Sequence, residues 1–336
     1  MKRLWHVLGW LVGAVSLGIF LVYFFDWKTT RDLLLNIRVS LVCLSLAVFF
    51  VAIFLRVIKW IYIIKLTEYV SLRDGYHTIM ISNMVNFILP VRAGEILKLY
   101  LINKSSGITY QASITATLWD RASHIILMML FLLFTPLAGF KFSQWTSSYI
   151  VFFSLFIIFI VLLFVLGTRC LDILQKSAIF FSNLVKIDRR RVDNLSESKF
   201  ISFCRETLEK LNISSFTKRS LLLIVLLTCI IISLDGICYY LIIMAFDIHI
   251  TWLQGTLAAC LMCLAFILPT PPGLVGTAEI YPVLIFSLGL GLPDAVISSA
   301  AVLWHLLTIV FIIVLGICSL SALGLRLGSL LRSARV

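Results

Sequence analysis

A motif that occurs twice restricts the architectures open to this 336-residue chain more than any other feature of its sequence. Residues 87–95 read FILPVRAGE and residues 266–279 read FILPTPPGLVGTAE, so the two copies begin with the same four letters. A glycine stands 12 residues after each glutamate, and a tryptophan, Trp119 or Trp304, stands 24 or 25 residues after it. Four residue types kept in register indicate an internal duplication. In membrane proteins, weak internal symmetry around interrupted apolar segments is typical of a transport site.

The composition places the chain in a membrane. Hydrophobic residues make up 61% of the sequence and charged residues 13%, and the mean hydropathy is +1.07. These values lie far outside the range of a soluble domain and predict an all-α, polytopic membrane helical bundle. The net charge of +12 does not indicate nucleic-acid binding, because the basic residues lie in segments that flank apolar runs. Membrane topology and anionic lipids at the inner surface explain them better.

Eight cysteines suggest neither disulfides nor a metal site, because most of them lie inside apolar runs. A thiol there behaves as a small hydrophobic group. Cys260 and Cys263 have the spacing of a redox or zinc motif, but one face of an apolar helix is the simpler interpretation.

Six apolar stretches are long enough to cross the hydrocarbon core, which needs about 20 residues. They are residues 7–25, 39–64, 111–135, 148–167, 220–246 and 293–318. Two further apolar regions, 75–103 and 252–288, are each interrupted by one copy of the motif. Their arms of about 10 to 17 residues are too short for an easy crossing, so we predict two re-entrant broken-helix hairpins. Full crossing by both hairpins would leave the same charge distribution and stays open as an alternative.

The chain is predicted to form one transmembrane domain over residues 1–336. A first repeat covers about 39–167, a basic amphipathic segment covers 168–219 on the cytoplasmic surface, and a second repeat covers about 220–318. With both termini in the cytoplasm, most Lys and Arg residues fall on the inner side of the cell membrane, as the positive-inside rule requires. The two hairpins then enter from opposite sides, which is an inverted repeat of the kind used for alternating access.

Charged and titratable residues inside apolar segments are the first candidates for a site. Each costs about 2.5–3.5 kcal/mol at the centre of a membrane helix, so each needs a partner or a function. Their placement in and after the helix breaks favours a function, although ion pairs that only hold the bundle together would explain them too. The candidates are Arg92, Glu95, Asp120, Arg121, Asp235, Glu279 and His305.

The breaks themselves are predicted to form an anion site. Pro90 ends one short helix, Gly94 frees a turn, and the next half-helix would point its N–H groups and Arg92 at a phosphate. In the second copy, Pro269, Gly273 and Gly276 supply the matching break. Thr277 is the predicted N-cap there, and Glu279 lies in the following first turn. Asn83 and Asn86, which precede the first break, would add hydrogen bonds.

We expect Glu95, Glu279 or His305 to carry protons. The tryptophans place His305 at the position equivalent to Asp120. Asp120 and His124 share a helical face, but no cluster of three or four metal ligands is evident, so no metal or other cofactor is expected. Arg56 and Lys59 are interpreted as snorkelling toward the inner interface, with contact to a substrate as the alternative. No phosphate-binding loop of the G-x-x-x-x-G-K-[ST] type occurs, so the chain itself is not expected to couple to ATP.

Residues 86–95 with Trp119-Asp120-Arg121, and residues 268–279 with His305, resemble the lysylphosphatidylglycerol synthase transmembrane family, also called flippase-like membrane proteins. The resemblance covers nearly the whole chain. It implies lipid handling in a membrane. Because no synthase domain follows in this sequence, lysyl transfer is not expected.

Three functions follow as hypotheses. The first is a flippase or transporter that moves a phospholipid-like or polyprenyl-phosphate-like lipid with an anionic headgroup between leaflets. The second is a membrane-embedded transferase or phosphatase acting on a lipid headgroup, with a glutamate or His305 as base. The third is a non-catalytic partner of a lipid-synthesising enzyme. The expected protein partners are accordingly such an enzyme or a second copy of the chain.

Overall fold

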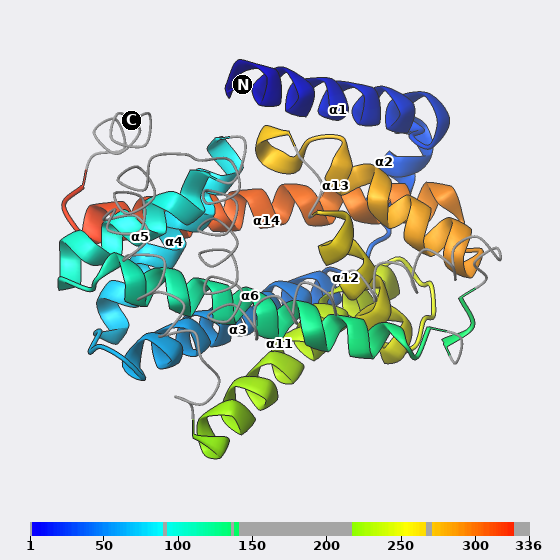
Figure 1. Ribbon diagram of the computed structural model, residues 1–336. Helices are drawn as coiled ribbons and strands as arrows, with labels where there is room; N and C mark the ends of the chain where they lie inside the picture. Colours follow the sequence, from blue (N-terminus) through cyan, green and yellow to red (C-terminus); the bar gives the residue numbers. More distant parts are fainter. Residues whose placement is uncertain (1, 90–92, 136–137, 141–216, 267–270, 326–336) are drawn as a thin grey trace, which may run out of the picture.

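The computed structural model describes residues 2–89, 93–135, 138–140, 217–266 and 271–325, and of residues 2–12 it describes the backbone alone. Every regular element in these ranges is a helix, which confirms the predicted all-α membrane bundle (Figure 1). The predicted span 148–167 and nearly all of the basic segment 168–219 lie outside the described residues. The elements are α1 (Lys2–Tyr23), α2 (Trp27–Leu35), α3 (Val39–Lys65), α4 (Leu72–Ile88), α5 (Ala93–Ser106), α6 (Tyr110–Leu132), α11 (Lys218–Met244), α12 (Trp252–Ala265), η4 (Pro272–Leu274), α13 (Thr277–Pro282), η5 (Val283–Leu288) and α14 (Asp294–Ala322).

The helices repeat in the order that the duplicated motif predicts. The starts of α3 and α11, Val39 and Lys218, are separated by the same length of chain as Phe87 and Phe266, the first residues of the two motif copies. The starts of α5 and α13 are slightly farther apart, and the starts of α6 and α14 have this same larger separation. The extra residues of the second copy therefore lie before α13, in the α12 hairpin. The repeat thus consists of a long helix, two short helices and a second long helix.

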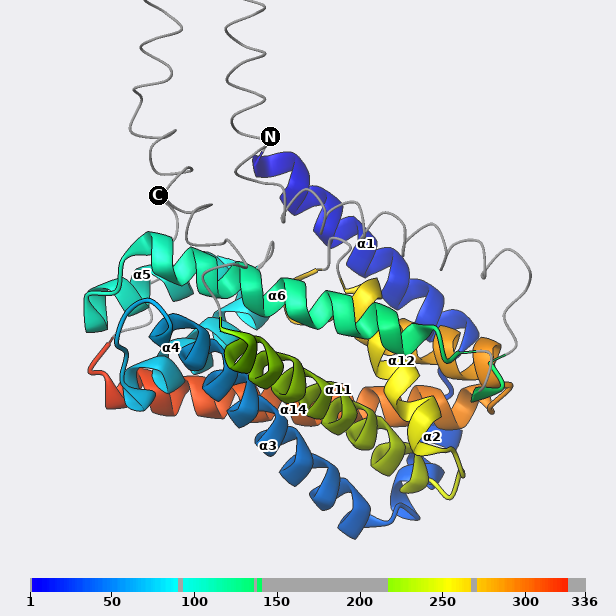
Figure 2. The same cartoon turned by 60° about the horizontal axis from the view of Figure 1, so that its bottom comes forward.

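The equivalent helices α3 and α11 run in opposite directions. Ser45 near the start of α3 donates a hydrogen bond to the carbonyl of Cys238 near the end of α11, at 3.0 Å. Lys59 near the end of α3 donates to Thr228 near the start of α11, at 3.2 Å. Figure 2 shows the two helices side by side through the middle of the molecule. Equivalent helices that are antiparallel are the mark of an inverted repeat.

Both predicted hairpins are broken helices. In the first, Ser106 at the end of α5 donates to the carboxylate of Asp74 at the start of α4, at 3.0 Å, so the chain returns to the level at which it entered. The 17 residues of α4 span about 26 Å, which is less than the ~30 Å hydrocarbon core and favours the re-entrant form. Among the described helices, only α3, α11 and α14 are long and apolar enough to cross by themselves, so the total number of spans stays a prediction.

Each hairpin packs against the last long helix of the other repeat. α4 lies along α14, and α12 lies against α6, so the two repeats interlock rather than standing side by side. The hairpins lie at opposite ends of the molecule, with α4 and α5 at one end and α12 and α13 at the other (Figure 1). The two hairpins contact each other where α4 meets η4.

The second break is closed on one side by α1. Gly276 has φ +84°, and a Cβ there would lie 2.5 Å from the carbonyl oxygen of Gly13 and 2.6 Å from the amide nitrogen of Leu17. No side chain fits between this turn and the backbone of α1. Glycine is therefore required both by the left-handed conformation and by the close approach.

We expect Gly276→Ala to lower the free energy of unfolding by about 1–3 kcal/mol, because the added methyl group strains the turn and pushes α1 away. Gly291→Ala is the matched control: its φ is +71°, but no atom of the described chain lies within 4 Å of an added Cβ. Thermal unfolding of both variants in detergent micelles separates the two effects. Equal losses in the two variants would show that the contact with α1 contributes nothing.

Candidate functional site

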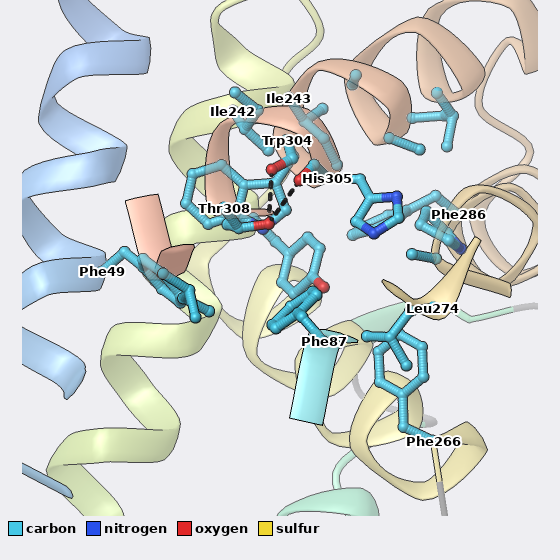
Figure 3. A pocket seen from close by; sticks show the side chains of 17 residues that line it. Phe49, Phe87, Ile242, Ile243, Phe266, Leu274, Phe286, Trp304, His305 and Thr308 are labelled. Carbon is cyan, nitrogen blue, oxygen red and sulfur yellow. Dashed lines mark hydrogen bonds between the residues drawn. The ribbon is translucent and has the colours of Figure 1, made fainter. Parts of the chain in front are cut away.

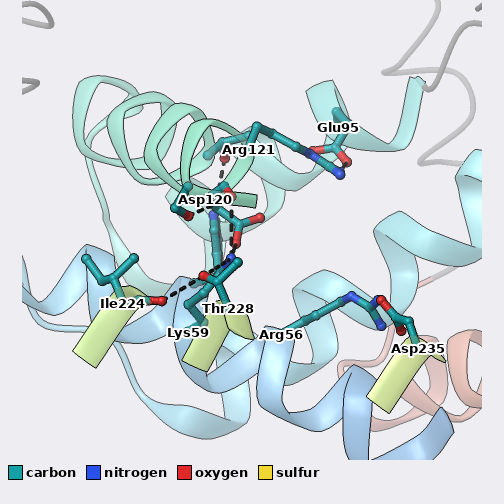
Figure 4. A network of polar contacts seen from close by, with 11 residues as sticks. Arg56, Lys59, Glu95, Asp120, Arg121, Ile224, Thr228 and Asp235 are labelled. Atoms are coloured by element: carbon teal, nitrogen blue, oxygen red, sulfur yellow. Dashed lines mark hydrogen bonds and ion pairs between the residues drawn. The ribbon is translucent and has the colours of Figure 1, made fainter. Parts of the chain in front are cut away.

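A cluster of charged side chains lies between the two repeats (Figure 4). At its centre is Lys59 of α3, whose side chain is only 1% exposed. Its Nζ lies 2.8 Å from Oδ1 of Asp120 on α6 and donates to Oγ1 of Thr228 on α11 at 3.2 Å. The prediction that Lys59 snorkels to the interface is therefore wrong. Its ammonium group is held inside the protein by a carboxylate and a hydroxyl.

Glu95 lies in the first turn of α5 and binds two cations. Its Oε2 is 2.9 Å from Nζ of Lys98, and its Oε1 accepts from Nη2 of Arg121 on α6. Lys98 also lies over the ring of Trp60, at 5.1 Å from the ring centroid. Arg121 is half exposed. The Glu95 carboxylate satisfies only part of its guanidinium, which has five N–H donors.

Arg56 of α3 forms an ion pair with Asp235 of α11. The arginine side chain is 34% exposed and the aspartate side chain 13% exposed. Arg56 points at Asp235 (Figure 4) and lines two polar cavities, so the snorkelling interpretation is wrong for this residue as well. Asp235 was predicted to be a site residue, and the structure places it at the edge of the charged cluster.

Two adjoining polar cavities, of about 350 Å³ and about 260 Å³, open onto this cluster. Both are lined by Arg56, Asn83, Glu95 and Arg121. The larger cavity is bounded by residues next to the first break and by residues of the second: Asn86, Phe87, Leu89, Phe266, Pro271 and Leu274. The predicted polar pocket between the two breaks is thus present. It brings two guanidinium groups and two side-chain amides to one space.

An apolar cavity of about 180 Å³ lies next to the larger polar one and shares part of its wall with it. Aromatic rings make up much of the lining (Figure 3). Phe49, Phe87 and Phe266 line both cavities, and Trp304 lines the apolar one. A ligand in this region would therefore meet cationic groups on one side and hydrocarbon on the other.

In the second repeat, Glu279 is buried and fully bonded. Its Oε2 accepts from the backbone N–H of Gly276 at 2.7 Å, and its Oε1 lies 2.6 Å from Nδ1 of His305 on α14. The other ring nitrogen of His305 lies 2.7 Å from the carbonyl oxygen of Gly273. The N-cap of α13 is Gly276 and not Thr277 as predicted, because the Thr277 hydroxyl donates back to the carbonyl of Leu274.

The two glutamates are held in the same way. Glu95 pairs with Arg121 and Glu279 with His305, and in each repeat the basic partner follows 26 residues after the glutamate. His305 lies as far into α14 as Arg121 lies into α6, so it is equivalent to Arg121 and not to Asp120 as predicted from the tryptophans. Trp119 and Trp304 lie within α6 and α14, which are both continuous helices without an inserted residue. The two tryptophans are therefore not at equivalent positions, although their spacings from the glutamates differ by only one residue.

The remaining predicted site residues fall into three groups. Asn83 and Asn86 line the larger cavity, and Oδ1 of Asn86 is buried without a hydrogen-bond partner among the described residues. Gly94 lies within α5 and not in a turn, and a Cβ there would collide with the carbonyl oxygen of Ser82. Pro90, Arg92 and Pro269 lie outside the described residues.

The described residues contain no group of three His, Cys, Asp or Glu side chains that could hold a metal ion. Cys260 and Cys263 lie on the apolar helix α12, where the Cys260 thiol is buried. Arg56, Lys59 and Lys98 belong to the site but are not among the site residues predicted from the sequence. Their signal was a charge inside an apolar helix, at a spacing that fits snorkelling equally well.

The fold and the site together define an integral membrane protein with two inverted, broken-helix repeats around a charged interior. The family model described as lysylphosphatidylglycerol synthase TM region matches residues 7–316, so the chain belongs to this family. This makes it a membrane protein related to lipids and confirms the resemblance seen in the motifs. No curated protein and no solved structure matches the chain.

We expect Asp120→Asn to lower the free energy of unfolding by about 3–5 kcal/mol, because it leaves the buried ammonium of Lys59 without a counter-ion. The matched control is Asp247→Asn, which removes the carboxylate of an exposed ion pair with Arg38. This variant is expected to change the free energy of unfolding by less than about 1 kcal/mol. Denaturant titration in mixed micelles measures both. The double change Lys59→Met with Asp120→Leu should regain most of the loss, and a failure to do so would contradict this account.

Proposed function

We propose that the protein moves a lipid with an anionic headgroup between the two leaflets of the membrane. The observation that carries the proposal is the pairing of cavities: a polar space with the guanidinium groups of Arg56 and Arg121 adjoins an aromatic-lined apolar space. A phosphate or carboxylate binds guanidinium through charge-assisted, bidentate hydrogen bonds. The acyl or prenyl chains lie on the apolar side, against its aromatic lining.

Alternating access follows from the inverted repeats. Two repeats related by a two-fold axis in the membrane plane can exchange conformations, so that each repeat adopts the packing of the other. The exchanged state exposes a central site to the opposite side of the membrane. Residues that flank the breaks of both hairpins line the larger cavity, so rocking of one repeat against the other changes access to the headgroup site.

The pair formed by Glu279 and His305 is the proposed site of proton coupling. Both ring nitrogens of His305 face acceptor atoms, the Glu279 carboxylate and the Gly273 carbonyl. The nitrogen that faces the Gly273 carbonyl donates its own N–H, and one further proton, held by His305 or by Glu279, forms the hydrogen bond between the two side chains. Uptake and release of this further proton is the proposed coupling step. Of the described residues on the wall of this apolar cavity, Tyr239 of α11 is the other titratable one. In the first repeat the equivalent position holds Arg121, whose charge is permanent.

A lipid-headgroup transferase or phosphatase is less well supported. A general base needs a free lone pair within reach of its substrate, and both nitrogens of His305 are occupied by the protein itself. The transport assay below distinguishes this alternative, because an enzyme would alter the lipid chemically.

In proteoliposomes, Arg121→Gln should reduce the movement of a labelled anionic lipid about 10-fold or more, because a charge-assisted hydrogen bond contributes about 1.5–3 kcal/mol. Arg38→Gln is the matched control, since Arg38 is an exposed arginine in an ion pair away from the cavities. Mass spectrometry of the lipid after the assay tests for chemical change. A wild-type protein that moves no lipid, or that yields a modified lipid, would overturn the proposal.

A transmembrane pH gradient should change the rate of lipid movement by wild-type protein several-fold, and His305→Gln should remove this response. Glutamine can donate and accept hydrogen bonds but cannot take up and release the further proton. His249→Gln, at an exposed histidine after α11, should respond as the wild type does. Proton coupling at this pair is wrong if His305→Gln keeps the full response to the gradient.

A further inference from the structure

Arg56 and Asp235 occupy the same position in the two repeats. They are 179 residues apart, which is also the distance between the starts of α3 and α11. Equivalent residues of an inverted repeat contact each other only where the chain crosses its internal two-fold axis. This ion pair therefore lies on the axis about which the two repeats are related. Two identical charges there would repel each other, and the chain has opposite charges instead.

The two partners are placed unequally around the cavities. Arg56 lines both polar cavities and a third of about 150 Å³, whereas Asp235 lines only the third. Nη2 of Arg56 donates to Oδ2 of Asp235, which is the one hydrogen bond found for this guanidinium within the described ranges. This bond uses one of the five N–H donors of the guanidinium, and Arg56 shares the lining of both polar cavities with Arg121.

We infer that Asp235 is an internal competitor for the substrate: the phosphodiester of an anionic lipid binds Arg56 in place of the Asp235 carboxylate. The inference rests on the proposed function and names the anion-binding residue and its resting counter-ion. Binding of the headgroup then separates α3 from α11 at the axis, where a small displacement changes the relation of the two repeats. An empty carrier keeps the axis closed because Asp235 neutralises Arg56.

Replacing the competitor tests the inference. Asp235→Asn keeps the shape of the side chain but removes its charge, so dioctanoyl-phosphatidylglycerol should bind the purified protein about 10-fold more tightly. Tryptophan fluorescence in detergent reports binding, because Trp60 lines the smaller polar cavity. Asp247→Asn, the exposed aspartate that pairs with Arg38, is the matched control and should leave the affinity unchanged. Unchanged or weaker binding by Asp235→Asn would overturn the inference.

A charge exchange keeps the test valid if the single variant folds poorly. Arg56→Asp with Asp235→Arg restores an ion pair on the axis but moves the guanidinium to the position that lines only the third cavity. If the ion pair has only a structural role, the double variant should regain both stability and lipid binding. Competition with substrate predicts that stability returns while binding of dioctanoyl-phosphatidylglycerol stays at least 10-fold weaker than in the wild type.

Two further ligands identify the source of the anion. Dioctanoyl-phosphatidylcholine carries the same phosphodiester with a neutralising quaternary ammonium group, so Asp235→Asn should raise its affinity less. Inorganic phosphate that binds as tightly as the lipid would overturn the assignment to a lipid headgroup.

The transport assay separates this inference from the proposed function. Lipid movement by the wild type with no gain in affinity in Asp235→Asn refutes the competitor alone. A gain in affinity without movement of any lipid refutes transport and supports the anion site.

Discussion

A helix that breaks inside a membrane leaves backbone N–H and C=O groups that hydrocarbon cannot satisfy, and the rest of this structure depends on how the protein binds them. At the first break, the Ser82 hydroxyl donates to the carbonyl of Gly94. At the second, Glu279 accepts from Gly276, and His305 binds the carbonyl of Gly273. Ser82 thus ties α5 to α4 beside the first break, and Glu279 of α13 and His305 of α14 hold the backbone of the second. The polar interior follows from this requirement.

The bonds that satisfy the second break also position charge. Each repeat anchors the glutamate of its second short helix to a basic residue on the following long helix, and these contacts fix the hairpin relative to the bundle. The basic partner of this glutamate differs between the two repeats. One copy has an arginine, whose charge is permanent, and the other has a histidine in hydrogen-bond contact with its glutamate. A second difference between equivalent residues, Arg56 and Asp235, lies on the axis that relates the two repeats.

Much of the site could be predicted because proline and glycine mark helix breaks in any context. The duplicated motif predicted the two hairpins, the two glutamates and the pocket between the breaks. The partners could not be predicted, because ion pairs form between helices that are far apart in the chain. Arg56 and Lys59 have a spacing that fits snorkelling, and only the neighbours Asp235 and Asp120 turn them inward. The register of His305 was misjudged because one tryptophan is not at an equivalent position.

Hydropathy, span length and helix-breaking residues act locally, so the order of residues alone specifies a helical membrane protein with two related halves and two interrupted segments. The pairing of the charges, in contrast, comes from the packing of the helices. Lys59 lies among Asp120 and Thr228 because α3, α6 and α11 cross there, and a buried charge is stable only where several helices bring its partners together. Such contacts depend on packing between distant segments, and no local pattern encodes them.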